Sequence, residues 1–477
     1  KGFFVNEVFQ QIVYALVALT VLSVVLVIIS ENRNPVKSVA WILLLIFLPL
    51  LGLIAYFLIG QDFTKKYAYK RKKHRGKDQA FLIKSDQVLD EQDYPRAFTA
   101  PVKLLKNIQN ALLIGGNDVK YFTLAADKYR QMLADMEEAK RFIHLEYYAL
   151  ENGLWGDALK DLLIRKSASG VEVRIIYDDW GCWRTKKSYF KELIDNGVQV
   201  RVFSKVRILP LTARLNYRDH RKLIIIDGLI GYIGGMNISD RYVNGFNWGC
   251  WADTHCRIAG PGVVQLQSVF LSNWQRQSGE VLWEDEYFPL PASCGDNALQ
   301  VVASGPGSLD PEILHVMIQA FYSAEKYIYV QTPYFIPPEP LAGALQAAAI
   351  RGLDVRLMIS KRSDLPLVQM ASRSYIREML ERGIKVYFYT RGFLHSKMMV
   401  VDGELSIMGS ANADMRSFED NLEVQAFIYG HSAALRAQEI FLEYQQDCEK
   451  INLERWKKRS RLKRFVESFM RLFAPLL

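Results

Sequence analysis

Two stretches of the sequence carry the same pattern of residues that could do chemistry. The pattern is H-x-K-x4-D-x6-G-[GS]-x-N, which occurs in YRDHRKLIIIDGLIGYIGGMN and again in FLHSKMMVVDGELSIMGSAN. Its fixed positions are His220, Lys222, Asp227, Gly234, Gly235 and Asn237 in the first copy, and His395, Lys397, Asp402, Gly409, Ser410 and Asn412 in the second. One chance match in this chain has odds on the order of 10⁻⁵. Two matches therefore indicate a duplicated functional site.

The local sequence of each copy predicts how these side chains are presented. HRKLIII and HSKMMVV are strand-like, so the His and the Lys two residues later should project from one face. The Asp-Gly that follows is a turn signal, and the chain should return as a second strand. The small Gly-Gly or Gly-Ser pair allows close approach to an anion. Together the copies would place two histidines, two lysines and two asparagines around one phosphate, with Lys222, Asn237, Lys397 and Asn412 as the phosphate-binding residues.

This set of side chains suits phosphoryl transfer without a metal ion. The lysines balance the anionic charge, one histidine attacks phosphorus, and the other protonates the leaving oxygen. No His, Asp or Glu cluster has convincing metal-ligand spacing, so we predict no metal. A single His-Lys pair could belong to a solvated strand edge, but the duplication argues against that alternative.

A histidine nucleophile needs a partner that fixes its tautomer, usually a carboxylate. Asp253 in WADTHCRI and Glu423 in DNLEVQAFI follow the two motifs in strand-like runs and are the candidates. The alternative is that both are ordinary surface carboxylates. Asp227 and Asp402 belong to the motif and so to the candidate catalytic set. Their Asp-Gly context, however, predicts backbone capping more than acid–base work.

The region from about 118 to 454 consists of two copies of one sequence repeat. FIHLEYYALENG pairs with YIYVQTPYFIPP, SGVEVRIIYDD with RGLDVRLMISK, and KELIDNGVQVRVF with REMLERGIKVYFY. Short β-rich runs alternate with amphipathic helices, which predicts α/β sandwich domains. Two copies suggest pseudo-twofold packing with a shared site at the junction. We expect a first domain over 118–295 and a second over 296–454.

The N-terminal part predicts a membrane anchor. Residues 8–30 and 38–61 contain no charged side chain, and a helix of either length would cross the ~30 Å hydrocarbon core. The short connection between them predicts a two-helix transmembrane hairpin over 1–61, with Pro49 kinking the second helix. A signal peptide is the alternative for the first segment, but its apolar part is too long. A basic juxtamembrane segment and linker would then occupy 62–117.

The formal charge of +9 is concentrated in two segments. Residues 61–78 carry a net +6 and residues 455–464 a net +7, which leaves about −4 for the rest. An acidic body argues against a nucleic-acid partner, whereas two basic strips fit an anionic membrane surface. The run after 61 places the body in the cytoplasm by the positive-inside rule. The five cysteines lack metal or disulfide spacing, which agrees with a reducing compartment. The tail 455–477 is basic and amphipathic; it either lies on the membrane or packs as a terminal helix.

The duplicated motif resembles that of the phospholipase D superfamily, and the match covers about 118–454. ENRNP, SVAW, QTPYFIP, GGMNISDRY and the terminal APLL make the chain similar to the bacterial cardiolipin synthases in particular. The resemblance implies two phospholipase D-like domains at the bacterial inner membrane. It also implies conversion of two phosphatidylglycerols to cardiolipin and glycerol, with no nucleotide or other cofactor. It implies that His220 forms a phosphatidyl-histidine while His395 acts as general acid. The repeat alone leaves open which histidine attacks. Gly235 departs from the superfamily pattern, which has Ser there, and this puts a phosphate contact in doubt.

Other functions remain in competition at this point. The same side chains could serve a hydrolytic phospholipase D or a phosphatidyltransferase that uses another acceptor such as phosphatidylethanolamine. A nuclease shares the chemistry, but the anchor and the acidic body argue against it. A non-catalytic lipid-binding scaffold would be expected to have a broken motif, and neither copy is broken. A homo-oligomer stays open.

Overall fold

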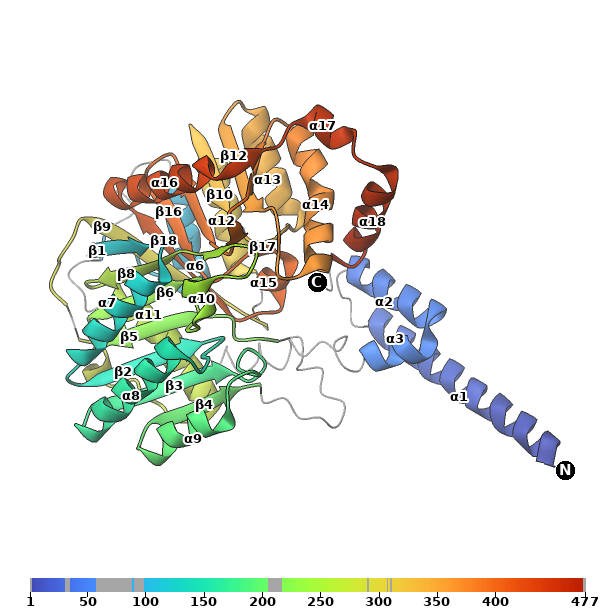
Figure 1. Ribbon diagram of the computed structural model, residues 1–477, viewed down its shortest axis with the longest axis horizontal. Helices are drawn as coiled ribbons and strands as arrows, with labels where there is room; N and C mark the ends of the chain where they lie inside the picture. The colour runs from blue at the N-terminus through green and yellow to red at the C-terminus, as the bar shows by residue number, and fades with distance from the viewer. Residues whose placement is uncertain are drawn as a thin grey trace.

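A computed structural model describes residues 2–30, 35–56, 88–89, 98–204, 217–289, 291–306, 308 and 311–474. Within these ranges the chain forms an α/β body and a separate group of N-terminal helices (Figure 1). Several sequence predictions lie outside the described residues. They concern most of the loop between the two apolar segments, the end of the second segment, the basic run at 61–78 and the last three residues of the tail.

A mixed sheet of fifteen strands forms the centre of the body (Figure 1). From the junction outward, the first half contributes β1 (Ile114–Phe122), β8 (His255–Ala259), β6 (Ile230–Gly234), β5 (Lys222–Ile226), β2 (Phe142–Tyr147), β3 (Glu172–Asp178) and β4 (Gln199–Phe203). In the other direction, the second half contributes β9 (Asn297–Ser304), β18 (Glu423–Tyr429), β16 (Leu405–Gly409), β15 (Met398–Val401), β10 (Tyr327–Gln331), β12 (Asp354–Ser360), β13 (Lys385–Tyr389) and β19 (Cys448–Lys450). The halves join where β1 pairs antiparallel with β9.

Segments that repeat in the sequence occupy equivalent places in the sheet. β2 and β10 each pair antiparallel with the strand that follows a motif histidine, β5 or β15. On its other side each pairs parallel with the next strand, β3 or β12. This mixture of parallel and antiparallel pairs, with helices between the parallel strands, confirms the predicted α/β class.

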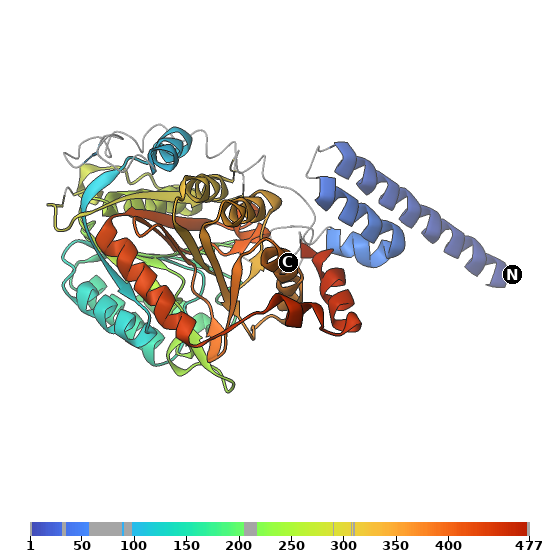
Figure 2. The ribbon, with the colours of Figure 1, turned by 90° about the horizontal axis from the view of Figure 1, so that it is seen from above.

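Helices cover both faces of the sheet (Figure 2). One layer consists of α6 (Thr99–Gln109), α7 (Ala125–Glu137), α8 (Leu154–Ala168), α9 (Lys187–Asp195), α12 (Glu312–Ser323), α13 (Glu339–Ile350) and α14 (Pro366–Glu381). The other layer consists of α11 (Val263–Ser278) and α16 (His431–Gln446). Fully buried aromatic side chains such as Phe321 and Trp274 fill the two interfaces. Removal of this apolar surface from water stabilises the three layers.

Short elements lie near the ends of the central strands, and one pair of them connects the two halves. β7 (Cys250–Ala252) pairs parallel with β14 (Gly392–Leu394), although the two lie 140 residues apart in sequence. β11 (Phe335–Ile336) pairs with β17 (Ala413–Asp414). The remaining short helices are α10 (Arg241–Asn244), the 3-10 turn Asp285–Tyr287, α15 (Met415–Glu419), α17 (Leu453–Lys457) and α18 (Arg461–Arg471). The strand pair β7–β14 ties a segment of the first half to one of the second.

The motif aspartates hold tight turns at the far end of β5 and β15 from the histidines. Asp227 accepts backbone N–H groups from Lys140, Arg141 and Phe142 at 2.8–2.9 Å. Asp402 accepts the equivalent three from residues 325–327 at 2.7–2.8 Å. Both adopt left-handed backbone conformations, with φ of 53° and 56°, which Asp tolerates better than most residues. Each carboxylate therefore fixes the start of β2 or β10, as the Asp-Gly context predicts, and makes no contact with a motif histidine in the structure.

The N-terminal apolar segments differ from each other in structure. α1 (Gly2–Ser30) contains the only helix among the described residues that is long and apolar enough to cross a bilayer, over Gln10–Ser30. The second segment is broken at Leu48 into α2 (Pro35–Phe47) and α3 (Pro49–Ala55). Gly52 of α3 packs so closely on the backbone of Leu44 that a Cβ there would lie 2.9 Å from its carbonyl oxygen. A simple two-span hairpin is therefore not confirmed: Pro49 ends a helix rather than only kinking it.

We predict that Asp402→Ala lowers the stability of the body by at least about 2 kcal/mol, because three N–H groups lose their acceptor. Asp402→Asn should cost less, since asparagine keeps one acceptor oxygen and tolerates the left-handed conformation. Thermal unfolding of the detergent-solubilised full chain measures the difference, with Asp195→Ala on the surface of α9 as the control. Equal melting temperatures for Asp402→Ala and the control would contradict this role.

Candidate active site

The motif histidines lie just before strands β5 and β15. β5 begins at Lys222 and β15 at Met398, so neither histidine belongs to the strand that the sequence predicts for it. Their backbones are instead held by the opposite half. The N–H of His220 donates to the carbonyl of Leu422 at 3.0 Å, and that of His395 to the carbonyl of Ala252 at 2.6 Å.

Each histidine side chain is also paired with a carboxylate from the opposite half. Nδ1 of His220 lies 2.9 Å from Oε1 and 3.2 Å from Oε2 of Glu423. Nδ1 of His395 lies 2.7 Å from Oδ2 of Asp253. Both carboxylates are buried, whereas the histidine side chains keep 14% and 10% of their surface exposed. The structure thus brings both predicted partners to the histidines, and leaves each Nε2 as the nitrogen not held by a carboxylate.

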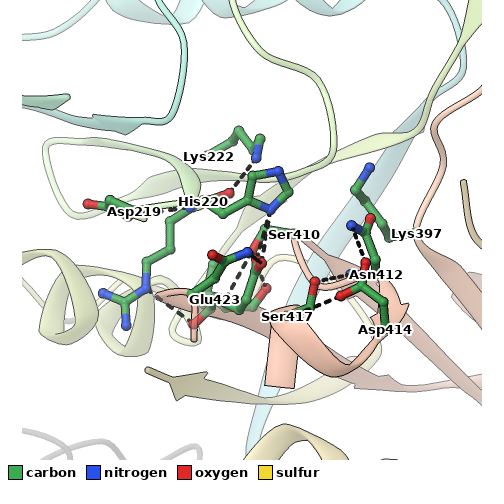
Figure 3. A network of polar contacts seen from close by, with 12 residues as sticks. Asp219, His220, Lys222, Lys397, Ser410, Asn412, Asp414, Ser417 and Glu423 are labelled. Carbon is green, nitrogen blue, oxygen red and sulfur yellow. Dashed lines mark hydrogen bonds and ion pairs between the residues drawn. The ribbon is translucent and has the colours of Figure 1, made fainter. Parts of the chain in front are cut away.

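The motif lysines are buried beside the histidines. The ammonium of Lys222 donates to the backbone carbonyl of His220, and that of Lys397 to the carbonyl of His395 at 2.5 Å. Figure 3 shows the imidazole of His220 between Lys222 and Glu423, with Lys397 facing it across the site. Burial, together with the charge of the other lysine, lowers the pKa of Lys222 to about 7; burial lowers the pKa of Lys397 to about 8. Two closely placed ammonium groups make a site that favours a bound anion.

The two histidine–carboxylate pairs differ in charge state. Burial lowers the pKa of His220 to about 4, although Glu423 opposes this shift, and it lowers the pKa of His395 well below its usual value. Burial raises the pKa of Asp253 to about 7. Burial also acts to raise the pKa of Glu423, but His220 and Lys222 together hold it below the usual value. Glu423 is therefore a stable carboxylate at neutral pH, whereas the Asp253 pair can carry an extra proton.

The small residues of the motif explain part of this difference. Ser410 donates its hydroxyl to Glu423 and accepts the N–H of Val424 at 3.0 Å. At the equivalent position, a Cβ on Gly235 would collide with the carboxylate of Asp253. Asp253 instead accepts the N–H of Thr254 at 2.7 Å. In the second copy, the hydroxyl of Ser410 contacts the carboxylate of Glu423. In the first copy, glycine stands at the equivalent position, and the carboxylate of Asp253 lies where a serine side chain would be.

The two asparagines are already engaged with protein groups. The amide of Asn237 donates to Tyr242 at 2.6 Å and accepts the N–H of Ala149 at 3.1 Å. The amide of Asn412 donates to Asp414 at 3.0 Å. One N–H of each amide is left over by these bonds, since each NH₂ carries two. Phosphate binding by the asparagines stays a prediction.

Aromatic side chains close to the histidines escaped the sequence reasoning. The ring of Tyr148 lies edge-on to His220 at 5.1 Å, and Lys222 lies 5.3 Å from the same ring. Trp251 lies 5.4 Å from His395, and Tyr242 lies 6.2 Å from it. The position of Trp251 two residues before Asp253 is the signal that could have found it. Tyr148 follows a strand that reads as core, so its exposure to the site could not be told from sequence.

No group of three or more His, Cys, Asp and Glu side chains is placed to hold a metal ion within the part of the chain that the structure describes. All five cysteines are free.

Comparison with known proteins shows a match over almost the whole chain. A family model described as cardiolipin synthase, phospholipase D-like domain, matches residues 132–252 and 317–445, and a phospholipase D-nuclease N-terminal model matches 18–61. A cardiolipin synthase of Alkalihalophilus pseudofirmus is 37% identical, covering 96% of this chain and 92% of its own length. The major cardiolipin synthase of Bacillus subtilis is 37% identical, with coverage of 96% and 97%. The crystal structure of a phosphatidylserine synthase from Haemophilus influenzae superposes with a TM-score of 0.58 at 14% identity, over 79% of this chain and 98% of that one, which shows a shared fold.

We predict that the cross-half pairing is visible as two strongly deshielded Nδ1–H proton signals in NMR spectra of the full chain with labelled histidines. Asp253→Asn should remove the same signal as His395→Ala, because the charged acceptor of that short hydrogen bond is lost. Glu423→Gln should remove the same signal as His220→Ala. The reverse assignment, with each carboxylate acting on the histidine of its own half, would contradict the structure.

Proposed function

Since the chain belongs to the cardiolipin synthase family and is a phosphatidyltransferase of the phospholipase D type, we propose that it joins two phosphatidylglycerols into cardiolipin and releases glycerol. The observation that carries this proposal is the pair of histidines, each backed by a carboxylate from the other half, beside two lysines. Two histidine–carboxylate pairs, of which the Asp253–His395 pair can hold an extra proton near neutral pH while Glu423 stays ionised, suit a double displacement at one phosphorus.

In the first step, Nε2 of His220 attacks the phosphorus of one phosphatidylglycerol. The N–P bond forms and the bond from phosphorus to the glycerol oxygen breaks. Nε2 of His395 gives its proton to that oxygen, while Asp253, whose raised pKa lets it hold a proton near neutral pH, passes that proton to Nδ1 of His395. Two features support this assignment. Glu423 stays ionised and stabilises the positive charge that develops on His220, while the Asp253 pair can hold a proton near neutral pH. Lys222 and Lys397 balance the charge on the phosphoryl oxygens.

In the second step, a glycerol hydroxyl of another phosphatidylglycerol attacks the phosphohistidine. Nε2 of His395 takes the hydroxyl proton, and the proton on Nδ1 returns to Asp253, as the new O–P bond forms and the N–P bond breaks. One phosphodiester replaces another, so the reaction needs no nucleotide. Asp227 and Asp402 take no part in proton transfer, because backbone N–H groups occupy their carboxylates.

We also infer that the body consists of two units, over 118–295 and 296–454, related by a pseudo-twofold axis at the β1–β9 junction. The order of equivalent strands, which runs outward in opposite directions from that junction, supports this relation. Such an axis would pass between the histidines. It explains why equivalent residues from both units face one phosphate.

The membrane attachment has two components. α1 supplies a helix that can cross the bilayer. α18 packs on α14, where Arg471 stacks on Tyr375 at 4.1 Å, and it exposes an apolar stripe on its other side made of Leu462, Phe465, Phe469 and Leu472. One face of α18 packs on the body, as the terminal-helix alternative predicts, and the opposite apolar face is free to lie on a membrane, as the other alternative predicts. We propose that the body lies at the cytoplasmic side of the bacterial inner membrane, since the basic run at 65–77 follows the apolar segments.

The test of this function is a product assay with the full chain in vesicles of phosphatidylglycerol, with and without phosphatidylethanolamine. We expect cardiolipin and glycerol in equal amounts by mass spectrometry. His220→Ala and His395→Ala should each lower turnover by about 10³-fold or more, because each removes one partner of the proton and phosphoryl transfers. Phosphatidic acid as the main product would replace this proposal with hydrolysis.

We predict that kcat/KM of the free enzyme falls as the pH rises above about 7 to 8. Lys222 and Lys397 have lowered pKa values and lose their positive charge in this range, so the anionic headgroup binds less well. Asp253, with a pKa of about 7, loses in the same range the proton that the leaving oxygen needs. Activity should also fall as the pH drops towards 4, where His220 becomes protonated and cannot attack. Lys222→Arg should make the alkaline limb less steep, because a guanidinium keeps its charge while Asp253 and Lys397 still titrate. An alkaline limb of unchanged steepness in this variant would show that the charge of Lys222 does not contribute to it.

A further inference from the structure

Two loops next to the catalytic histidines expose large apolar side chains. The loop after β3 exposes Trp180 (52%) and Trp183 (69%), and the loop after β12 with the start of α14 exposes Leu365 (49%), Leu367 (55%) and Met370 (36%). Together these five residues are called the apolar rim. β3 and β12 are equivalent strands of the repeat, so the rim has one part in each half.

Hydrogen bonds place both parts of the rim beside the catalytic histidines. Asp178 at the end of β3 accepts the N–H of Asp219, the residue before His220, at 2.9 Å. Ser360 at the end of β12 accepts the N–H of Leu394, the residue before His395, at 2.6 Å. The strand residue just before each loop therefore contacts the residue just before a catalytic histidine, and the two loops flank the site.

The loops are held in place by their own contacts. Asp178 also accepts the N–H groups of Trp180 and Gly181 at 2.9 Å, and Thr185 donates to the carbonyl of Leu150 at 2.5 Å. In the second loop, Gln369 and Arg373 both donate to the carbonyl of Lys361, at 2.6 and 2.9 Å. The apolar side chains are thus presented to the solvent by hydrogen-bonded backbones, and several large apolar side chains exposed on neighbouring positions of a loop are typical of an interaction surface.

The charges around the rim indicate what it binds. Exposed basic residues accompany the apolar ones: Arg184, Lys186 and Lys187 in the first loop, and Lys361 and Arg362 in the second. Counted with Asp179 and Asp364, the two loops carry a net +3, although the chain outside its two basic segments carries about −4. Tryptophan with lysine and arginine is typical of surfaces that contact the headgroup region of anionic membranes.

The rim is also continuous with the membrane-facing parts of the chain. α14 begins within the rim, at Pro366, and α18 packs along α14 with its apolar stripe exposed. α18 lies beside α2 and α3 in both views (Figures 1 and 2). The same side of the body therefore carries α14, the amphipathic helix α18 and the N-terminal apolar helices.

We propose that the apolar rim inserts into the headgroup region of an anionic bilayer and seats the mouth of the active site on it. This inference rests on the proposed function, because it concerns how a lipid reaches the site. The histidine side chains are only 10–14% exposed, so the phosphate must enter a recess. A rim that rests on the bilayer lets a headgroup enter while its acyl chains remain in the membrane.

Kinetics with two forms of the substrate test this proposal. We compare long-chain phosphatidylglycerol in vesicles with short-chain phosphatidylglycerol dissolved as monomers. Trp180→Ser/Trp183→Ser, and independently Leu365→Ser/Leu367→Ser, should lose vesicle turnover about tenfold or more beyond any loss with the monomeric substrate, given the apolar area withdrawn from the bilayer. Leu229→Ser/Ile350→Ser is the matched control: both side chains are exposed, near the opposite ends of the strands, and the ratio should not change.

A second measurement does not depend on activity. In vesicles that contain phospholipids with brominated acyl chains, Trp180→Phe/Trp183→Phe should remove a quenched component of the tryptophan fluorescence. Trp283→Phe should not, because Trp283 stacks on Phe288 near the Asp227 turn, far along the strand from His220.

The outcomes separate the two proposals. If the rim substitutions lower the turnover of vesicle and monomeric substrate by the same factor, the rim is not a bilayer contact. The same conclusion follows if Trp180→Phe/Trp183→Phe leaves the quenched fluorescence component unchanged. Conversion of a dimer into monomers by the rim substitutions, measured by sedimentation, would assign the surface to a second copy and also overturn it. A wild-type chain that forms no cardiolipin from either substrate refutes the proposed function, while the quenching measurement still decides the rim.

Discussion

The structure depends on one arrangement: each half of the body supplies the carboxylate and the carbonyl that hold the histidine of the other half. His220 contacts Leu422 and Glu423, and His395 contacts Ala252 and Asp253. Neither half alone has an oriented histidine, so the site exists only when the β1–β9 junction and the β7–β14 pair are formed. Two buried charge-assisted hydrogen bonds are worth forming only with good geometry, which explains why the contacts involve backbone as well as side chains.

Within this duplicated frame, small differences give the two histidine–carboxylate pairs different electrostatic environments. Glu423 receives a hydroxyl from Ser410 and an amide from Asn421 at 3.2 Å, which stabilise its negative charge. Asp253 has one backbone N–H in addition to its histidine, and Gly235 leaves no room for a serine. A carboxylate with fewer donors in a buried site is protonated more easily. The proposed division into one nucleophile and one acid therefore needs only these small differences between nearly identical parts.

Much of the site could be predicted from the sequence, because the motif repeats and its strand, turn and strand pattern is local. The Asp-Gly turns, the α/β class and both carboxylate candidates followed from patterns of a few residues. Which carboxylate pairs with which histidine could not be predicted. His220 and Glu423 are 203 residues apart, and a repeat is equally compatible with each carboxylate serving its own half or the other half. The break at Leu48 was also missed: composition gives the length of an apolar segment, whereas the close packing of Gly52 on Leu44 is a tertiary contact.

The position of the site within the fold connects its charge to the membrane. Two lysines with lowered pKa values in a recess attract a phosphate but are too few to bring an acidic body to an anionic surface. That attraction has to come from elsewhere, and the basic segments at 61–78 and 455–464 carry most of the positive charge. We propose that these segments attract the body to an anionic surface over distances of about a Debye length, and that apolar contacts then fix its orientation. In this proposal long-range charge selects the membrane, and short-range geometry selects the phosphodiester.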